Sequence, residues 1–258
     1  MQANPFASES MAAGYAQSRP PVHREIVRRA LSEPVDRVLD VGCGAGFSTT
    51  ALAGWARHTV GLEPAEPMLA YGRQMAPSGD FVVGQGECLP FPAQTFGGLT
   101  AAGSLNYANP AQSLAEARRV LVPGGWLLAY DFSAGRRMAG YDETEDPLAA
   151  WFAKFQESYA PPQGEAIPLD PETIAALAPE MALAHWERVE VVLPLYRNFY
   201  LNYMLTETNV AAAVRRGVPL DAIRHWCEDS LAKVWEGSGS IDGRRDILFR
   251  GYYVVLTK

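Results

Sequence analysis

Short apolar runs alternate with amphipathic stretches through the first half of the chain, and this rhythm limits the possible folds more than any other feature. Each apolar run has the length of a buried strand, and a helical pattern follows most of them. Repeated strand–helix units build a mostly parallel sheet with helices on both faces, so the sequence predicts a doubly wound α/β fold. The apolar runs lie at 37–41, 58–62, 81–83, 99–102 and 126–130, and the helical patterns at 21–31, 47–54, 66–75 and 111–121.

The rhythm changes after Asp131, where two helix-rich segments each precede an isolated strand-like run. The two runs would bring the sheet to seven strands. Because no internal repeat or long Gly/Ser linker occurs, and 258 residues fit one α/β domain with insertions, we predict a single domain over 1–258. Its core covers about 21–135 plus strands at about 186–194 and 246–257, and the segments at about 136–185 and 195–245 are helical lid insertions.

Composition excludes several classes of function. The formal charge of −7 disfavours a general nucleic-acid binder, because phosphate binding depends on clustered Lys and Arg. Three widely spaced cysteines without a CxxC motif indicate no disulfide framework, and the four histidines lack metal-ligand spacing, so no metal is predicted. No apolar run of 18 residues or secretory leader occurs, so we expect a cytoplasmic protein without membrane contact.

A glycine-rich loop, Gly42-x-Gly44-x-Gly46, follows the first predicted strand and opens a helix. Such a turn lets a ligand approach the backbone and the amides at the helix N-terminus. A dinucleotide fingerprint would need glycine at the sixth position, where this chain has Phe47. An NAD(P)-dependent oxidoreductase is therefore a less favoured alternative, and a tight turn without a ligand is the simplest one.

Two acidic residues flank this loop. Glu63 ends the second strand, 21 residues after Gly42, where its carboxylate can accept both hydroxyls of a ribose. Asp40 lies inside the apolar first strand, where an unpaired carboxylate would be costly. Its partner is either a cationic ligand or the loop itself. Together the loop and the two acids favour a ribose-containing ligand.

Four stretches of this half carry motifs in a recognisable order: VLDVGCGAG at 38–46, VGLEP at 60–64 followed by Met68, GQGECLPFP at 84–92 and RRVLVPGG at 118–125. They resemble the class I S-adenosylmethionine-dependent methyltransferases, in the small-molecule branch similar to the ubiquinone/menaquinone-biosynthesis type. The resemblance covers about 15–132 and implies a Rossmann-like methyltransferase fold, S-adenosylmethionine as cofactor and methyl transfer to a small-molecule acceptor. It leaves open whether the acceptor atom is oxygen, nitrogen or carbon.

The resemblance also assigns roles around the cofactor. It places Asp40 and the three loop glycines at the methionine part, Glu63 at the ribose, Met68 on the adenine face and 85–87 at the adenine edge. The family usually has Asp where this chain has Gln85, although a Gln carbonyl can still accept a hydrogen bond. The implied cofactor-binding set is Tyr15, Arg19, Asp40, Gly42, Cys43, Gly44, Gly46, Glu63, Pro64, Met68, Gln85, Gly86, Glu87 and Ala102.

No catalytic base can be assigned from the sequence. The resemblance places Tyr107 near the methyl group, where it could equally well only pack. An S-adenosylmethionine-binding protein without transferase activity therefore stays an alternative. A nucleic-acid methyltransferase is disfavoured because Asn109-Pro110 is followed by Ala-Gln rather than Pro-Tyr. We expect a small-molecule acceptor as the partner, no nucleic acid, and a monomer or homodimer.

Overall fold

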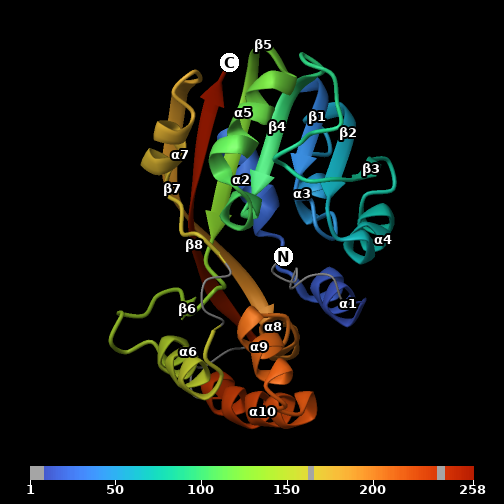
Figure 1. The fold of residues 1–258 in the computed structure, drawn as a ribbon. Coiled ribbons are helices and arrows are strands. Elements are labelled where there is room, and N and C mark those ends of the chain that lie inside the picture. Colours follow the sequence, from blue (N-terminus) through green and yellow to red (C-terminus); the bar gives the residue numbers. More distant parts are fainter. Residues whose placement is uncertain (1–8, 162–165, 237–241) are drawn as a thin grey trace.

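The computed structural model describes residues 9–161, 166–236 and 242–258 (Figure 1). Its centre is a mixed sheet in the order β3-β2-β1-β4-β5-β8-β6, with β7 on the other side of β8. The first five strands are parallel, and β8 runs antiparallel to β5, β6 and β7. The strands are β1 (Val35–Val41), β2 (Ala56–Glu63), β3 (Asp80–Val83), β4 (Phe96–Ala102), β5 (Leu121–Phe132), β6 (Arg137–Met138), β7 (Ala182–Tyr196) and β8 (Arg244–Thr257).

This sheet confirms the predicted doubly wound, Rossmann-like methyltransferase fold. The described residues form eight strands rather than seven, because the two-residue β6 adds a short antiparallel pairing to β8. A pairing of two residues leaves no periodicity in a sequence, so the pattern of apolar residues could not reveal it. The two long final strands correspond to the runs predicted at 186–194 and 246–257.

Helices cover both faces of the sheet. On one face α2 packs Val22 and Ile26 against Val38 and Leu128, and on the other α5 packs Leu114 over strand residues that include Leu39. Neighbouring strand residues thus point to opposite buried faces, as in a parallel sheet covered on both sides. The helices are α1 (Glu9–Ser18), α2 (Val22–Ala30), α3 (Phe47–Ala51), α4 (Glu66–Met75), the 3₁₀ turn η1 (Ser104–Tyr107), α5 (Pro110–Val120), α6 (Pro147–Ser158), α7 (Pro171–Leu177), α8 (Arg197–Met204), α9 (Thr208–Arg215) and α10 (Leu220–Glu236).

An Asx-Pro pair begins each of three helices. The side chain of Asp170 accepts a hydrogen bond from the backbone N–H of Thr173, and Pro171 occupies the first turn of α7. Asp146 caps α6 and Asn109 caps α5 in the same way. A capping oxygen satisfies a free N–H of the first turn, and proline has no N–H to leave unsatisfied there. Such an Asx-Pro pair is therefore a local sequence signal for a helix start.

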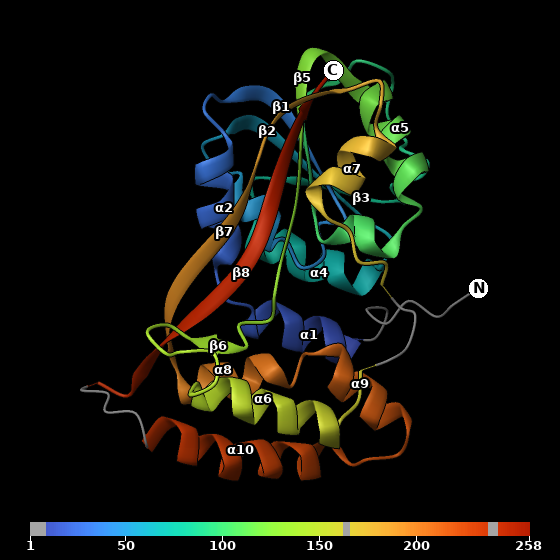
Figure 2. The same ribbon diagram turned by 90° about the vertical axis from the view of Figure 1, so that its left-hand side faces the viewer.

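Helices α6, α8, α9 and α10 lie together beyond one end of the sheet, and we refer to this group as the lid (Figure 2). Buried aromatic side chains fill the space between α6, α8 and α10, among them Trp151, Phe155 and Tyr200. The segment 136–185 divides between two locations, because α7 packs Ile174 into the core between α5 and the sheet. Among the described residues no helix is both long and apolar enough to cross a membrane.

Candidate functional site at the carboxyl edge of the sheet

The glycine loop lies at the carboxyl end of β1, and all three of its glycines have positive φ angles: 69° at Gly42, 52° at Gly44 and 87° at Gly46. A Cβ atom at Gly42 would lie 2.3 Å from the Cβ of Ser104 in the turn after β4. A Cβ at Gly44 would meet no heavy atom within 4 Å. The backbone at Gly42 is therefore packed against its neighbour, whereas Gly44 borders open space that a ligand can enter.

Asp40 lies beneath this loop and is completely buried. Its carboxylate accepts hydrogen bonds from the hydroxyls of Ser48 and Thr49 at 2.7 Å each and of Thr100 at 2.8 Å. Burial raises the pKa of this carboxyl, and the three hydroxyls act in the opposite direction. In the structure these three hydroxyls pair the carboxylate, so Asp40 anchors the start of α3 from behind the loop.

Glu63 connects the ends of β1 and β2. One carboxylate oxygen accepts the backbone N–H of Gly44 at 3.1 Å, and the other accepts that of Ala65 at 2.9 Å. The side chain is mostly buried, which raises the pKa of its carboxyl, while both backbone hydrogen bonds lower it. A carboxylate offers about four acceptor positions, so two remain for the hydroxyls of a ligand.

The residues predicted at the adenine lie around this edge in different environments. Met68 is buried against Ala12 and Ala16 of α1, so the N-terminal helix covers its side chain. Gln85 is exposed, whereas the Glu87 carboxylate accepts the backbone N–H of Asn109 at 2.8 Å. Of the remaining members of the set, Cys43 is buried in the loop, Pro64 is exposed, and Gly86 and Ala102 are half-buried.

Tyr15 and Arg19 connect this edge to the lid. The Arg19 guanidinium lies 4.0 Å from the centre of the Tyr15 ring and 5.0 Å from that of Tyr203 in α8. It also forms an ion pair with Glu207, with an N–O distance of 3.4 Å. Helix α1 therefore packs against α4 with one side while the residue that follows it contacts the lid.

A second polar cluster lies at the ends of β4 and β5, and among the polar residues there the sequence pointed only to Tyr107. Asp131 accepts a hydrogen bond from the side-chain amide of Asn106 at 2.7 Å and from the backbone N–H of Phe132 at 2.8 Å. Burial raises the pKa of the Asp131 carboxyl. The available signal was an acidic residue directly after the apolar run at 126–130, where a parallel strand reaches the ligand-binding edge.

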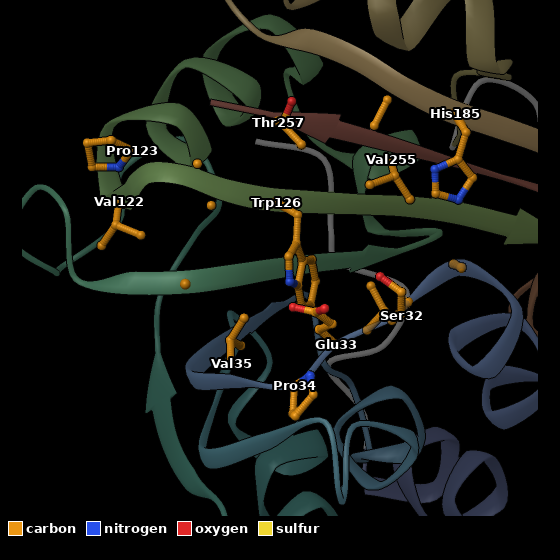
Figure 3. Close-up of a pocket in the computed structure, with 16 residues that line it drawn as sticks. Ser32, Glu33, Pro34, Val35, Val122, Pro123, Trp126, His185, Val255 and Thr257 are labelled. Atoms are coloured by element: carbon orange, nitrogen blue, oxygen red, sulfur yellow. The ribbon is translucent and has the colours of Figure 1, made fainter.

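A hollow at the opposite edge of the sheet is lined by Glu33, Trp126 and His185, among others (Figure 3). It borders the beginnings of β1, β4 and β5. Ligands of open α/β sheets bind beyond the carboxyl ends of the strands, so we assign the candidate site to the edge that carries the glycine loop. Within the described residues, no three His, Cys, Asp or Glu side chains gather as a metal site requires.

Comparison with known proteins agrees with this geometry. A model of the methyltransferase domain family matches residues 39–129. A demethylmenaquinone methyltransferase from Clavibacter sepedonicus is 30% identical over 197 residues, which cover 72% of this chain and 78% of that protein. The chain belongs to the class I S-adenosylmethionine-dependent methyltransferases of the ubiquinone/menaquinone type.

Two further similarities define how far this family relation extends. A demethylmenaquinone methyltransferase from Renibacterium salmoninarum is 36% identical over 111 residues, or 43% of this methyltransferase and 47% of that relative. The alignment thus spans about half of the relative's length. The crystal structure of the YcgJ protein from Bacillus subtilis has a TM-score of 0.54 at 18% identity, covering 92% of this chain and 97% of that one, which supports the fold.

Proposed function

We propose that this protein transfers a methyl group from S-adenosylmethionine to a small-molecule acceptor held between the carboxyl edge of the sheet and the lid. The observation that carries the proposal is the open space at Gly44 beside the Glu63 carboxylate, which still has acceptor positions. These are the requirements of a nucleoside with two adjacent hydroxyls and a polar tail lying along a backbone. The residues present fit this cofactor.

Each part of the edge has a separate task in this proposal. Glu63 accepts the ribose hydroxyls while it holds Gly44 in place through the backbone N–H. Asp40 keeps the loop in its binding conformation by anchoring α3. Tyr15 and Arg19 close the methionine side, and 85–87 lie at the adenine edge. When bound, the sulfonium supplies an activated methyl group, so the chain itself must align the acceptor and exclude water.

The relatives favour a small molecule over the alternatives. Their names describe methyl transfer to a quinone, which supports a ring-containing acceptor for this chain. An NAD(P) enzyme is disfavoured by Phe47, and a nucleic-acid substrate by the net charge of −7. A binding protein without transferase activity would keep the cofactor site but lack any group suited to the acceptor.

Calorimetry and radiolabelled transfer test this function together. We expect S-adenosylhomocysteine, the demethylated product, to bind the wild type and NADH not to bind. Glu63→Ala should weaken the affinity at least tenfold, because a charge-assisted hydrogen bond contributes roughly 1.5–3 kcal/mol. Glu87→Gln serves as a matched acidic control on the adenine side, with a smaller loss expected.

Transfer of a labelled methyl group is then measured to a panel that includes reduced 1,4-naphthoquinone, catechol and aliphatic amines. Labelled product from any of them supports the enzyme, and the panel identifies the acceptor atom. Tight binding of NADH with no binding of the sulfonium compound or its product would overturn the proposal.

A further inference from the structure

The ends of four neighbouring strands define the length of the ligand-binding edge. Glu63 lies at the end of β2, the glycine loop follows β1, the turn η1 follows β4, and Asp131 lies at the end of β5. Adjacent strands are about 4.8 Å apart, so three steps separate the backbones at Glu63 and Asp131 by roughly 14 Å. A nucleoside anchored at Glu63 and extending over the glycine loop therefore leaves the end near Asp131 for a second molecule.

The turn between β4 and α5 joins the two ends of this edge. The Ser104 hydroxyl donates to the carbonyl oxygen of Val41, which fixes the turn against the glycine loop at 2.6 Å. Two residues further on, Asn106 donates its side-chain amide to the Asp131 carboxylate. A Cβ at Gly103 would lie 3.2 Å from an Asp131 oxygen, so this carboxylate borders the backbone just after β4. The same turn thus contacts the glycine loop through Ser104 and orients the Asp131 carboxylate through Asn106.

Other titratable groups near this end are poorly suited to accept a proton. The pKa of the Tyr107 hydroxyl is raised to about 12 by burial and by the neighbouring Tyr15 and Asp131, so it stays protonated at neutral pH. Burial and the nearby Arg19 lower the pKa of His23 to about 3, and a base this weak takes up little proton near pH 7. Glu207 is engaged in the ion pair with Arg19.

We propose that Asp131 is the general base of this methyltransferase, that it takes the proton from a hydroxyl of an aromatic acceptor, and that Asn106 positions its carboxylate. The inference rests on the proposed function and narrows the acceptor to a molecule with an ionisable ring hydroxyl. Both Asp131 oxygens accept one hydrogen bond from the protein in the described structure, so each keeps a lone pair for the acceptor.

The proposed step moves one proton and one methyl group. The hydroxyl proton moves to an Asp131 oxygen, and the electron pair released on the acceptor forms the new bond to the methyl carbon, at the oxygen or at the conjugated ring carbon. The bond between carbon and sulfur breaks with its electron pair remaining on sulfur. A carboxylate and a sulfonium are consumed, and a carboxylic acid and a thioether are formed; methylation at ring carbon additionally releases that carbon's proton to water.

The surroundings of Asp131 suit this role. Burial raises the pKa of the carboxyl, which makes the carboxylate a stronger base than an exposed one, while the hydrogen bonds from Phe132 and Asn106 lower it. The titratable groups that face it among the described residues are Tyr107 from η1 and Tyr252 from β8, and both hydroxyls have raised pKa values. Neither contributes a charge at neutral pH, so the acidic limb of the rate profile should follow Asp131.

The first test compares wild type, Asp131→Asn and the control Asp36→Asn, whose exposed carboxylate lies at the far end of β1. Each is loaded with S-adenosylhomocysteine and titrated with catechol and 4-nitrocatechol from acid to neutral pH. We expect the wild type and Asp36→Asn to prefer the un-ionised probe, because a carboxylate repels a phenolate. In Asp131→Asn this preference should disappear, and catechol affinity should fall about tenfold.

The second test measures single-turnover methyl transfer to the same two probes. Loss of a general base typically costs 10²–10⁴-fold, and we expect Asp131→Asn to lose about 100-fold with catechol and clearly less with the more acidic 4-nitrocatechol. Asn106→Ala should move the acidic limb to higher pH, because it removes a hydrogen bond that favours the charged carboxylate. If Asp131 and Asn106 had only a packing role, these substitutions would change neither the pH of the acidic limb nor the ratio of the transfer rates with the two probes.

Several outcomes would overturn the inference. An unchanged pH preference in Asp131→Asn, or no binding of either probe to the loaded wild type, removes Asp131 as a base for ring hydroxyls while leaving methyl transfer to amines intact. A fall in S-adenosylhomocysteine affinity equal to the fall in transfer would assign Asp131 to the cofactor instead. Failure of the wild type to bind S-adenosylhomocysteine is a different result, since it overturns the proposed function itself.

Discussion

The carboxyl edge of the sheet and the lid are stabilised by different interactions. At the edge, buried carboxylates accept hydrogen bonds from nearby groups. Glu63 connects two loops by accepting a backbone N–H from each, and Asp40 accepts hydrogen bonds from three hydroxyls. In the lid, aromatic side chains pack against one another, as in the stacked pair of Trp151 and Phe155, whose ring centres are 5.3 Å apart. The structure of the edge therefore depends on a few hydrogen-bonding residues at fixed spacing, whereas the stability of the lid depends on how well buried side chains fill its interior. We expect substitutions in the two regions to affect different properties.

The largest effect should follow removal of an aromatic ring from the lid. Phe155 is fully buried and packs on Trp151 and Tyr159. Phe155→Ala should lower the free energy of unfolding by about 3–5 kcal/mol, because it leaves a cavity. The measurement is chemical denaturation, with S-adenosylhomocysteine affinity measured under native conditions. An equal loss of cofactor affinity in Phe155→Ala would contradict the expectation that substitutions in the lid affect stability rather than cofactor binding.

The next effect concerns two glycines of the same loop. Both Gly42→Ala and Gly44→Ala place a Cβ at positive φ, at a cost of roughly 1–2 kcal/mol. Gly42→Ala also forces contact with Ser104, which should add about 1–3 kcal/mol in unfolding experiments. Gly44→Ala should instead reduce cofactor affinity more than stability. Equal stabilities of the two variants would show that Ser104 moves aside freely.

The smallest effect is a pH dependence at Glu63. Burial raises the pKa of this carboxyl, so it takes up its proton at a higher pH than an exposed glutamate does. Below that pKa the neutral carboxyl is a weaker acceptor, and cofactor affinity should fall a few-fold as the solution is acidified. Calorimetric titrations at several pH values measure this. Glu63→Gln should bind more weakly and lose the part of the pH dependence that is due to this group.

The sequence predicted the edge better than the lid, and the reason is physical. The helix at 66–75 and the glycine loop were found where expected, because both depend on short local patterns. The strand predicted at 126–130 begins earlier, at Leu121. Pro123-Gly124-Gly125 is a sequence typical of a turn, and yet it lies within β5. The pairing of Asn106 with Asp131 joins residues 25 positions apart through strand order, which no local pattern encodes.

In the lid, too, a local sequence pattern predicts burial but not the contacts between distant segments. Aromatic residues at 196, 199, 200 and 203 have the spacing of one helical face, which is typical of core packing. Tyr200 and Tyr203 are completely buried, while Tyr196 is exposed at the start of α8. The contact between Tyr203 and Arg19 depends on how the lid meets α1. That arrangement is set by packing between distant segments, so the pattern identified a buried face without its partner.

The pairing of β7 with β8 extends beyond the pairing of β8 with β5 and connects the sheet to the lid. The two strands stay hydrogen-bonded from Ala182 and Thr257 to Tyr196 and Arg244, but β5 accompanies β8 only from Thr257 to Gly251. The remaining part is a ribbon of β7 and β8, which β6 joins only at Ile247 and Leu248. Helix α8 follows β7 without an intervening linker. The ribbon is anchored in the sheet at one end, where β8 also pairs with β5, and it carries α8 at the other end. A change of twist at the root of the ribbon would therefore displace the helices at its far end by a larger distance than it displaces the strands at the root.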